Sequence, residues 1–205
     1  MKLRMRVGWP LFAVLLLVFS ACTQLAYESM NDPSRDAWQQ PQDVVQALDI
    51  APGARIADLG AGGGYFTFSL AEAVGPEGRV YAVDVEEMSL RLIDKRAKEL
   101  GLRNIALIHA LPDDPLLPAE GVDLIFTSNT YHHLTNRVVY FKSLLRHLHP
   151  SGRVAIIDYK DGGWFGHATA KETVRREMET AGYHLVKDFD FLPRQHFQTF
   201  RPVAP

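Results

Sequence analysis

The sequence predicts an α/β fold: a doubly wound, seven-stranded, mostly parallel sheet with helices on both faces and an antiparallel strand pair at its C-terminal end. Two observations predict it. Short apolar runs alternate along the chain with segments of helical periodicity, and turns rich in glycine and proline separate the two kinds of segment. Strands that alternate with helices form parallel sheets that are covered by helices on both faces.

The predicted strands are short apolar runs that begin and end near turn residues, a pattern typical of buried strands. The first follows the turn at 52–53, and the second follows the turn at 75–78. The last two runs are expected to pair antiparallel. The seven predicted strands span residues 55–59, 79–83, 105–109, 122–127, 154–159, 185–191 and 197–201.

The predicted helices carry apolar residues three or four positions apart. Pro41 suits the first position of a helix, and Val44, Val45 and Leu48 give that helix an apolar side. Gly101 is suited to end another helix. The expected helices are a short one from Pro41 that ends before residue 52, and those at 65–74, 88–100, 137–148 and 169–181.

The composition is that of an ordinary globular protein. Of the 205 residues, 47% are hydrophobic and 22% are charged, and this length suits one domain with a substantial core. The formal net charge is only −2. Nothing therefore indicates a surface for polyanions, and nucleic acid is not an expected partner. The sequence does not indicate an oligomeric state.

Residues 1–21 have the pattern of a signal peptide. A basic start with Lys2, Arg4 and Arg6 precedes a wholly apolar run at 11–19, and small residues follow at the expected cleavage site. Cys22, the only cysteine, comes directly after them. The stretch Val-Phe-Ser-Ala-Cys that ends there resembles a bacterial lipobox. This resemblance implies a lipidated Cys22, a membrane anchor, and a location at the cell envelope on the periplasmic side.

Other interpretations of this end of the chain stay open. The pattern is also compatible with a plain signal peptide or an uncleaved anchor, and a translation start at Met30 would give a cytoplasmic protein. On the first interpretation, the chain divides into a signal peptide (1–21), a tether with an N-terminal arm (22–40) and the main domain (41–205).

A glycine-rich loop, Asp58-Leu-Gly60-Ala-Gly62-Gly-Gly64, follows the first predicted strand and opens a helix. Glycine permits positive φ and a close approach of backbone to ligand, and a helix start offers free N–H groups. The dinucleotide fingerprint Gly-x-Gly-x-x-Gly fails here, because Tyr65 stands at its last glycine position. The carboxylate of Asp58 suits a cationic ligand instead.

The loop resembles the cofactor loop of class I S-adenosylmethionine (SAM)-dependent methyltransferases, whose ligand carries a cationic amino group and a sulfonium centre. Three later segments resemble the same family in the expected order, at 80–84, 121–134 and 148–154. The resemblance covers about residues 41–205, which would be a SAM-dependent methyltransferase-type domain. It implies that SAM is the cofactor and that Asp84 accepts hydrogen bonds from the ribose hydroxyls. The residues that it assigns to SAM are Asp58, Gly60, Gly62, Gly64, Asp84 and Asn129.

One segment departs from the family pattern. Many relatives hold the adenine amino group with an Asp just after the third strand, where this sequence reads His109-Ala-Leu-Pro-Asp113-Asp114. Either Asp113 or Asp114 takes that role from a displaced position, or neither does.

Catalysis of methyl transfer depends mainly on alignment in a closed pocket, and a base is needed only for a protonated oxygen or nitrogen acceptor. His132 and His133 follow the fourth predicted strand and are the candidate catalytic residues. Either could act as a base or contact the acceptor, although packing alone would also account for them. No metal site is predicted, because His147 and His149 should lie at the opposite edge of the sheet.

Three further segments are candidates for the walls of the pocket. Tyr65 either lines it or packs in the core. The arm that carries Arg35, Asp36 and Trp38 either folds over the cofactor as a lid or packs on the surface. Residues 164–167 follow the fifth predicted strand and could influence the choice of acceptor.

The expected function is transfer of a methyl group from SAM to a small-molecule acceptor, because we find no inserted domain to grip a protein or nucleic acid. The export signal conflicts with a cytosolic cofactor. The alternative is therefore an exported, non-catalytic lipoprotein that binds SAM or a nucleoside. A NAD-dependent oxidoreductase is disfavoured by Tyr65 in the glycine loop.

Overall fold

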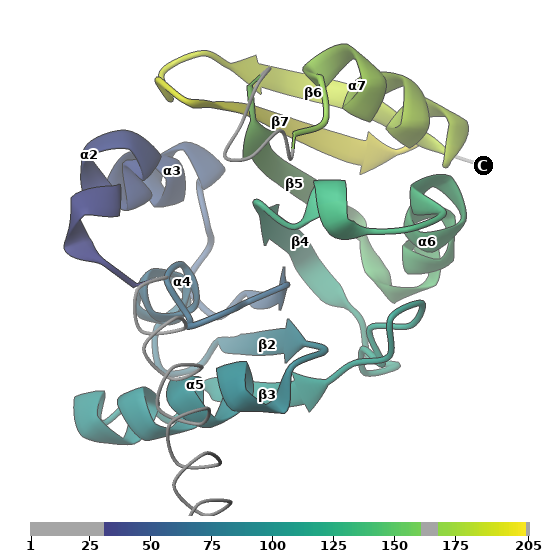
Figure 1. The fold of residues 1–205 in the computed structure, drawn as a ribbon. Helices are drawn as coiled ribbons and strands as arrows, with labels where there is room; N and C mark the ends of the chain where they lie inside the picture. Colours follow the sequence, from purple (N-terminus) through teal and green to yellow (C-terminus); the bar gives the residue numbers. More distant parts are fainter. Residues whose placement is uncertain (1–30, 161–167, 204–205) are drawn as a thin grey trace, which may run out of the picture.

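The computed structural model describes residues 31–160 and 168–203 and shows the predicted alternation of strands and helices (Figure 1). The strands are β1 (Arg55–Leu59), β2 (Arg79–Asp84), β3 (Ile105–His109), β4 (Val122–Ser128), β5 (Leu148–Tyr159), β6 (Tyr183–Phe189) and β7 (Gln195–Pro202). The α-helices are α2 (Asp36–Gln39), α3 (Pro41–Leu48), α4 (Thr67–Val74), α5 (Glu87–Leu100), α6 (Arg137–Leu144) and α7 (Lys171–Thr180). Single 3-10 turns are η1 (Pro33–Arg35), η2 (Tyr131–His133) and η3 (Leu145–His147).

The seven strands form a sheet of order β3-β2-β1-β4-β5-β7-β6. Strands β1 to β5 pair in parallel, and β7 runs antiparallel to both of its neighbours. The chain builds outward from β1 to β3 and then returns beside β1 with β4, which makes the β1–β4 junction the switch point of the topology. The predicted fold class, including the antiparallel C-terminal pair, is confirmed.

The core lies on both faces of this sheet, because successive side chains of a strand point to opposite sides. Ile56 and Leu124 pack in a cluster with residues of α3 and α4. Ala57 and Ile125, one position along each strand, pack in a second cluster with residues of α6 and α7. The central strands are buried on both sides, which explains why they read as continuous apolar runs.

The largest difference from the predicted boundaries lies at the start of β5. α6 ends at Leu144 and η3 continues the expected helix at 137–148 as far as His147, but β5 begins at Leu148 rather than at residue 154. Residues 150–152 read Pro-Ser-Gly, which is typical of a turn, but they lie in an irregularity of β5, since Leu148 pairs with Val122 and Arg153 pairs with Leu124. A pairing with β4 therefore overrides the local turn signal.

The predicted N-terminal arm is helical from residue 33 onward. Gln40 has a φ of 44° between α2 and α3, so the chain turns there instead of continuing as one helix. Over residues 31–160 and 168–203, we find no helix with the length and apolar character needed to cross a membrane.

Candidate functional site

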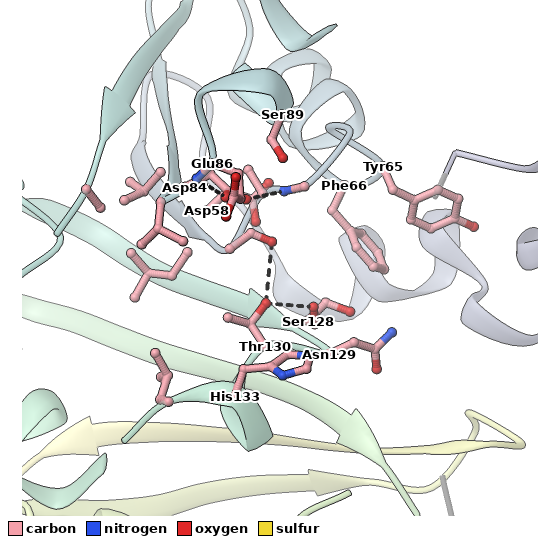
Figure 2. A pocket seen from close by; sticks show the side chains of 18 of the residues that line it. Asp58, Tyr65, Phe66, Asp84, Glu86, Ser89, Ser128, Asn129, Thr130 and His133 are labelled. Atoms are coloured by element: carbon pink, nitrogen blue, oxygen red, sulfur yellow. Dashed lines mark hydrogen bonds between the residues drawn. The ribbon is translucent and has the colours of Figure 1, made fainter. Parts of the chain in front are cut away.

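A cavity of about 940 Å³ opens at the carboxyl ends of β1, β2 and β4. It is lined by residues 58–63, 83–86, 110–112, 128–130 and 132–135, with Arg35 and Trp38 from the arm and Tyr159 from the end of β5. Figure 2 shows the side chains of the β4 segment facing those of the glycine loop and of the β2 end. Ligands of open α/β sheets bind at this place, outside the carboxyl ends of the strands at the switch point.

The glycine loop follows β1 and forms one wall of the cavity. Gly60 and Gly62 line it with φ values of 70° and 54°, a region that L-residues with side chains rarely adopt. Gly64, the third predicted glycine, lies outside the lining. A Cβ there would lie 2.8 Å from Phe68, so this glycine serves the packing of α4 against its loop.

Asp58, the penultimate residue of β1, is almost completely buried, and its Oδ2 accepts a hydrogen bond from Thr67 Oγ1 at 2.6 Å. Burial raises the pKa of Asp58 to about 7; the Thr67 hydrogen bond opposes this shift and the charge of Asp84 adds to it. A carboxyl that titrates near neutral pH, in the wall of a cavity, responds strongly to a cation placed beside it.

Asp84 ends β2 and holds the glycine loop in place. One carboxylate oxygen accepts the Gly62 N–H at 2.8 Å, and the other accepts the Glu86 N–H at 2.9 Å. Each oxygen keeps a second lone pair for a ligand. Beside it, the buried hydroxyl of Ser89 lines the cavity without a hydrogen-bond partner among the described residues. Sequence reasoning missed Ser89, because one serine in an amphipathic helix carries no signal.

The wall after β3 is apolar. Ala110, Leu111 and Pro112 line the cavity, but neither Asp113 nor Asp114 is among the lining residues. Asp114 instead accepts the Leu116 N–H at 2.9 Å. The sequence left open whether Asp113, Asp114 or neither contacts the adenine. The structure favours neither, because both carboxylates lie outside the lining of the cavity.

The segment after β4 forms the wall opposite Asp84. Asn129 has a φ of 55°, and its Oδ1 accepts a hydrogen bond from Gln195 Nε2 at 2.7 Å. Its own N–H donates to Ile157 O at 2.9 Å. Asn129 thus lies in the cavity wall and is held by β5 and β7, and its contact with SAM stays a prediction.

The two candidate catalytic histidines lie in η2 and both line the cavity. His132 Nδ1 lies 2.6 Å from Oδ1 of Asp158, a fully buried carboxylate in β5. His133 is more exposed, and its ring centroid lies 4.1 Å from that of His132. Asp158 was not predicted. An acid inside an otherwise apolar strand was the signal that could have found it.

The other histidine pair lies at the opposite edge of the sheet, as predicted. His149 Nδ1 lies 2.8 Å from Asp123 Oδ1 near the start of β4. Within residues 31–160 and 168–203, no group of three His, Cys, Asp or Glu side chains is arranged to hold a metal ion.

The arm packs over one side of the cavity through aromatic and charged contacts. Trp38 stacks on Tyr159 with ring centroids 5.9 Å apart, and the Arg35 guanidinium lies 4.4 Å from the centre of the Tyr65 ring. The Tyr65 hydroxyl donates a hydrogen bond to Asp36. Tyr65 itself lines the cavity. The predicted acceptor wall at 164–167 lies outside the described residues.

Comparison with known proteins identifies the family. The family model described as "Methyltransferase domain" matches residues 50–193, which is more than half of the chain. The protein therefore belongs to the methyltransferase-domain family. Its fold is also that of a solved SAM-dependent methyltransferase from Aquifex aeolicus, with 26% identity, a TM-score of 0.82, and coverage of 88% of this chain and 98% of that one.

Two curated relatives show the range of the sequence similarity. A demethylmenaquinone methyltransferase from Geobacillus stearothermophilus is 28% identical over 125 residues, which is 61% of this chain and 53% of the relative. An aklanonic acid methyltransferase from Streptomyces sp. (strain C5) is 34% identical over 112 residues, or 55% and 51% of the two chains. This chain thus spans about half the length of these relatives. The methyltransferase-type domain predicted from the sequence is confirmed.

Proposed function

We propose that this protein transfers a methyl group from SAM to a small-molecule acceptor. One observation carries the proposal: the glycine loop, the carboxylates of Asp58 and Asp84, and the histidines of η2 line one cavity. The family match supports the cofactor, and the relatives named for small-molecule methylation support the class of acceptor.

The residues of the cavity fit SAM chemically. Its volume of about 940 Å³ is in the range of cofactor sites. Asp84 has lone pairs for ribose hydroxyls, and the buried, unpartnered Ser89 hydroxyl beside it needs a polar partner. The buried Asp58 would favour the cationic amino group and the sulfonium of the ligand. Apolar Leu111 and Pro112 offer a surface for a flat base.

The chain's own groups hold and align the reactants. When bound, SAM supplies a methyl group that its positively charged sulfur activates. The glycine loop brings backbone close to the ligand, while Asp84 fixes that loop through the Gly62 N–H. Trp38 and Tyr159 stack on each other in the cavity wall, where they would limit the entry of water. Holding two reactants in line supplies most of the rate acceleration in such a displacement.

Titration calorimetry of the full-length chain with SAM tests the proposal. We expect binding in the micromolar range for the wild type and about tenfold or weaker binding for Asp84→Ala, because that variant loses ribose contacts and a support of the loop. Asp94→Ala is the matched control, since Asp94 is paired with Lys98 on the exposed side of α5. Failure of the wild type to bind SAM would refute the proposed function.

A screen of phenol, amine and thiol acceptors with labelled SAM follows. Methylation of any of them identifies an enzyme. Binding of SAM or a nucleoside without any transfer would instead favour the exported, non-catalytic binding protein that the leader sequence suggests as the alternative.

We also propose that Cys22 is lipidated and anchors the domain at the cell envelope on the periplasmic side. This rests on the sequence of residues 18–22, which lie outside the described residues. Mass spectrometry of the native protein should find an acylated Cys22 at the N-terminus. A chain that begins at Met30, with or without bound SAM, would contradict the anchor and indicate a cytoplasmic enzyme.

A further inference from the structure

We propose that Asp158 is a positioning residue that holds His132 as the base for a phenolic hydroxyl, so that the acceptor is a planar aromatic molecule with an O–H group. This inference rests on the proposed methyl transfer and names the substrate class of the same site. The observation behind it is the contact between a buried carboxylate and a histidine of the cavity wall.

The Asp158–His132 pair is buried and well defined. Asp158 Oδ1 lies 2.6 Å from His132 Nδ1, and the exposed fractions of the two side chains are 0% and 6%. The same oxygen accepts the Tyr159 N–H at 2.9 Å, so β5 fixes the orientation of the carboxylate. Its second oxygen, Oδ2, is buried and has no hydrogen-bond partner among the described residues. A buried charge is costly unless a partner compensates it, and the His132 ring is the titratable partner that the described residues place beside Asp158.

The proposal assigns one tautomer to the ring. An ionised carboxylate only accepts hydrogen bonds, so an ionised Asp158 would receive the proton that Nδ1 of His132 carries. Nε2 is then the nitrogen that holds the lone pair of the neutral imidazole, and it is the basic atom. The carboxylate also stabilises the imidazolium that forms when Nε2 gains a proton. Asp158 thus acts through His132 and not on the acceptor.

The surroundings of His132 favour a flat aromatic acceptor. Tyr159, whose ring centroid lies 6.1 Å from that of His132, stacks on Trp38 of the arm. His133, Tyr65 and Phe66 also line the cavity. Such rings gain energy from stacked or edge contacts with another ring. A thiol ionises near neutrality and needs no base, but a phenol, with a pKa near 10 like that of tyrosine, needs one.

The Thr130 side chain relates this base to the cofactor wall. Its hydroxyl contacts the carbonyl oxygens of Gly60 and Ser128, at 3.4 Å and 3.3 Å. His132 follows two residues later, so the segment that carries the base is in contact with the glycine loop. In the proposed step, the acceptor O–H bond breaks and its proton moves to His132 Nε2. The oxygen lone pair forms the bond to the methyl carbon, whose bonding pair with the cationic sulfur stays on sulfur as a neutral thioether.

The first test needs no substrate. In the full-length protein labelled with ¹⁵N-histidine, the His132 ring, assigned with His132→Gln, should show Nδ1 as the protonated nitrogen. The chain offers a pair for comparison at the opposite edge of the sheet, where His149 Nδ1 contacts Asp123 and its Nε2 contacts the Glu120 carbonyl oxygen. A His132 ring protonated at Nε2 alone would overturn the proposal.

The second test measures methylation of substituted phenols of graded acidity and of one thiophenol, with calorimetry of SAM in parallel. Asp158→Asn keeps the shape of the side chain but removes its charge. We expect kcat on the least acidic phenols to fall about 10³-fold, and kcat on thiophenol to change less than about threefold. SAM affinity should stay within about threefold of the wild type. Asp123→Asn, the control, should change none of these values.

The outcomes separate the two proposals. An equal loss on phenols and thiophenol would show a merely structural role for Asp158 and overturn the inference. Methylation of thiophenol alone by the wild type would overturn the phenolic acceptor while the proposed methyltransferase function stands. Failure to bind SAM would refute the proposed function, and the tautomer of His132 would still be measured independently.

Discussion

The Thr130 side chain occupies the space that a side chain on Gly60 would need. A Cβ at Gly60 would lie 2.2 Å from Thr130 Oγ1, 2.4 Å from its Cγ2 and 2.8 Å from its Cβ. The two residues follow β1 and β4, the strands that meet at the switch point of the sheet. The absence of a side chain at Gly60 therefore lets the glycine loop and the segment after β4 approach each other.

Gly60→Ala should be much more destabilising than a glycine substitution without a clash. We expect a loss of about 3 kcal/mol in the free energy of unfolding, because the Thr130 Cβ cannot rotate away and the φ of 70° is strained for alanine. Gly53→Ala is the control, since Gly53 has a φ of 82° but no atom within 4 Å of the added Cβ. It should cost about 1 kcal/mol. Equal losses in urea denaturation would show that the contact with Thr130 is unimportant.

Asp58 should make the stability of the ligand-free protein depend on pH. Its carboxyl has a pKa of about 7 in the fold, mainly because it is buried, and about 3.9 in an unfolded chain. Between these values the folded state holds the extra proton, so the free energy of unfolding should fall as pH rises from about 4 to 7 and level off above 7. Asp58→Asn should remove this slope, whereas the surface change Asp94→Asn should leave it. A slope that persists in Asp58→Asn would contradict the assignment.

The same carboxyl should couple SAM affinity to pH. If the cationic ligand requires an ionised Asp58, the Kd should fall as pH rises toward 7, by up to about tenfold per pH unit well below that value. Above pH 7 it should be nearly constant. Calorimetry in buffers of different ionisation enthalpy should detect the proton released on binding. Asp58→Asn should bind SAM more weakly than the wild type, with an affinity that does not change with pH.

The arm should depend on the Tyr65 hydroxyl for its attachment. Tyr65→Phe removes the hydrogen bond to Asp36, which we expect to be worth about 1 kcal/mol, and should speed tryptic cleavage after Arg35 about fivefold. Tyr81→Phe, in β2 and away from the arm, is the control and should cleave like the wild type. If SAM binds beneath the arm, it should slow cleavage of the wild type. An unchanged rate in Tyr65→Phe would show that the other contacts hold the arm.

The His149–Asp123 pair should contribute to stability only within a window of pH. The hydrogen bond to Asp123 raises the pKa of His149. The stabilisation that comes from the charged histidine is therefore complete below about pH 6.5 and is lost as pH rises through the raised pKa. Burial acts to raise the pKa of Asp123, but hydrogen bonds from Arg55 and His149 bring it below its ordinary value, so that part is lost in strong acid. The free energy of unfolding of His149→Gln should be lower than that of the wild type by less than about 1 kcal/mol, and the difference should be largest between pH 4 and 6.5. A loss that is constant up to pH 9 would contradict the charged pair.

The glycine loop and Asp84 were identifiable from the sequence because their roles depend on local chemistry. Glycines permit the positive φ values that the turn requires, and a carboxylate directly after an apolar strand lies at the edge where ligands bind. Gly64 is the exception. Its position in the loop matches the family pattern, but the Phe68 side chain occupies the place that a Cβ on Gly64 would take. The predicted start of the fifth strand at residue 154 was wrong for the opposite reason, since the early part of β5 pairs with β4, which lies far away in the sequence.

The sequence by itself determined the fold class, the order of strands and helices, the antiparallel end of the sheet and the position of the glycine loop. These follow from periodicity and turn chemistry, which act over a few neighbouring residues. Only the tertiary structure decided that Asp158 contacts His132 across 26 positions of sequence, that Ser89 joins the cavity, and that Trp38 stacks on Tyr159. Such contacts depend on how strands are ordered in the sheet and which side chains then share a face, and no local pattern encodes that choice.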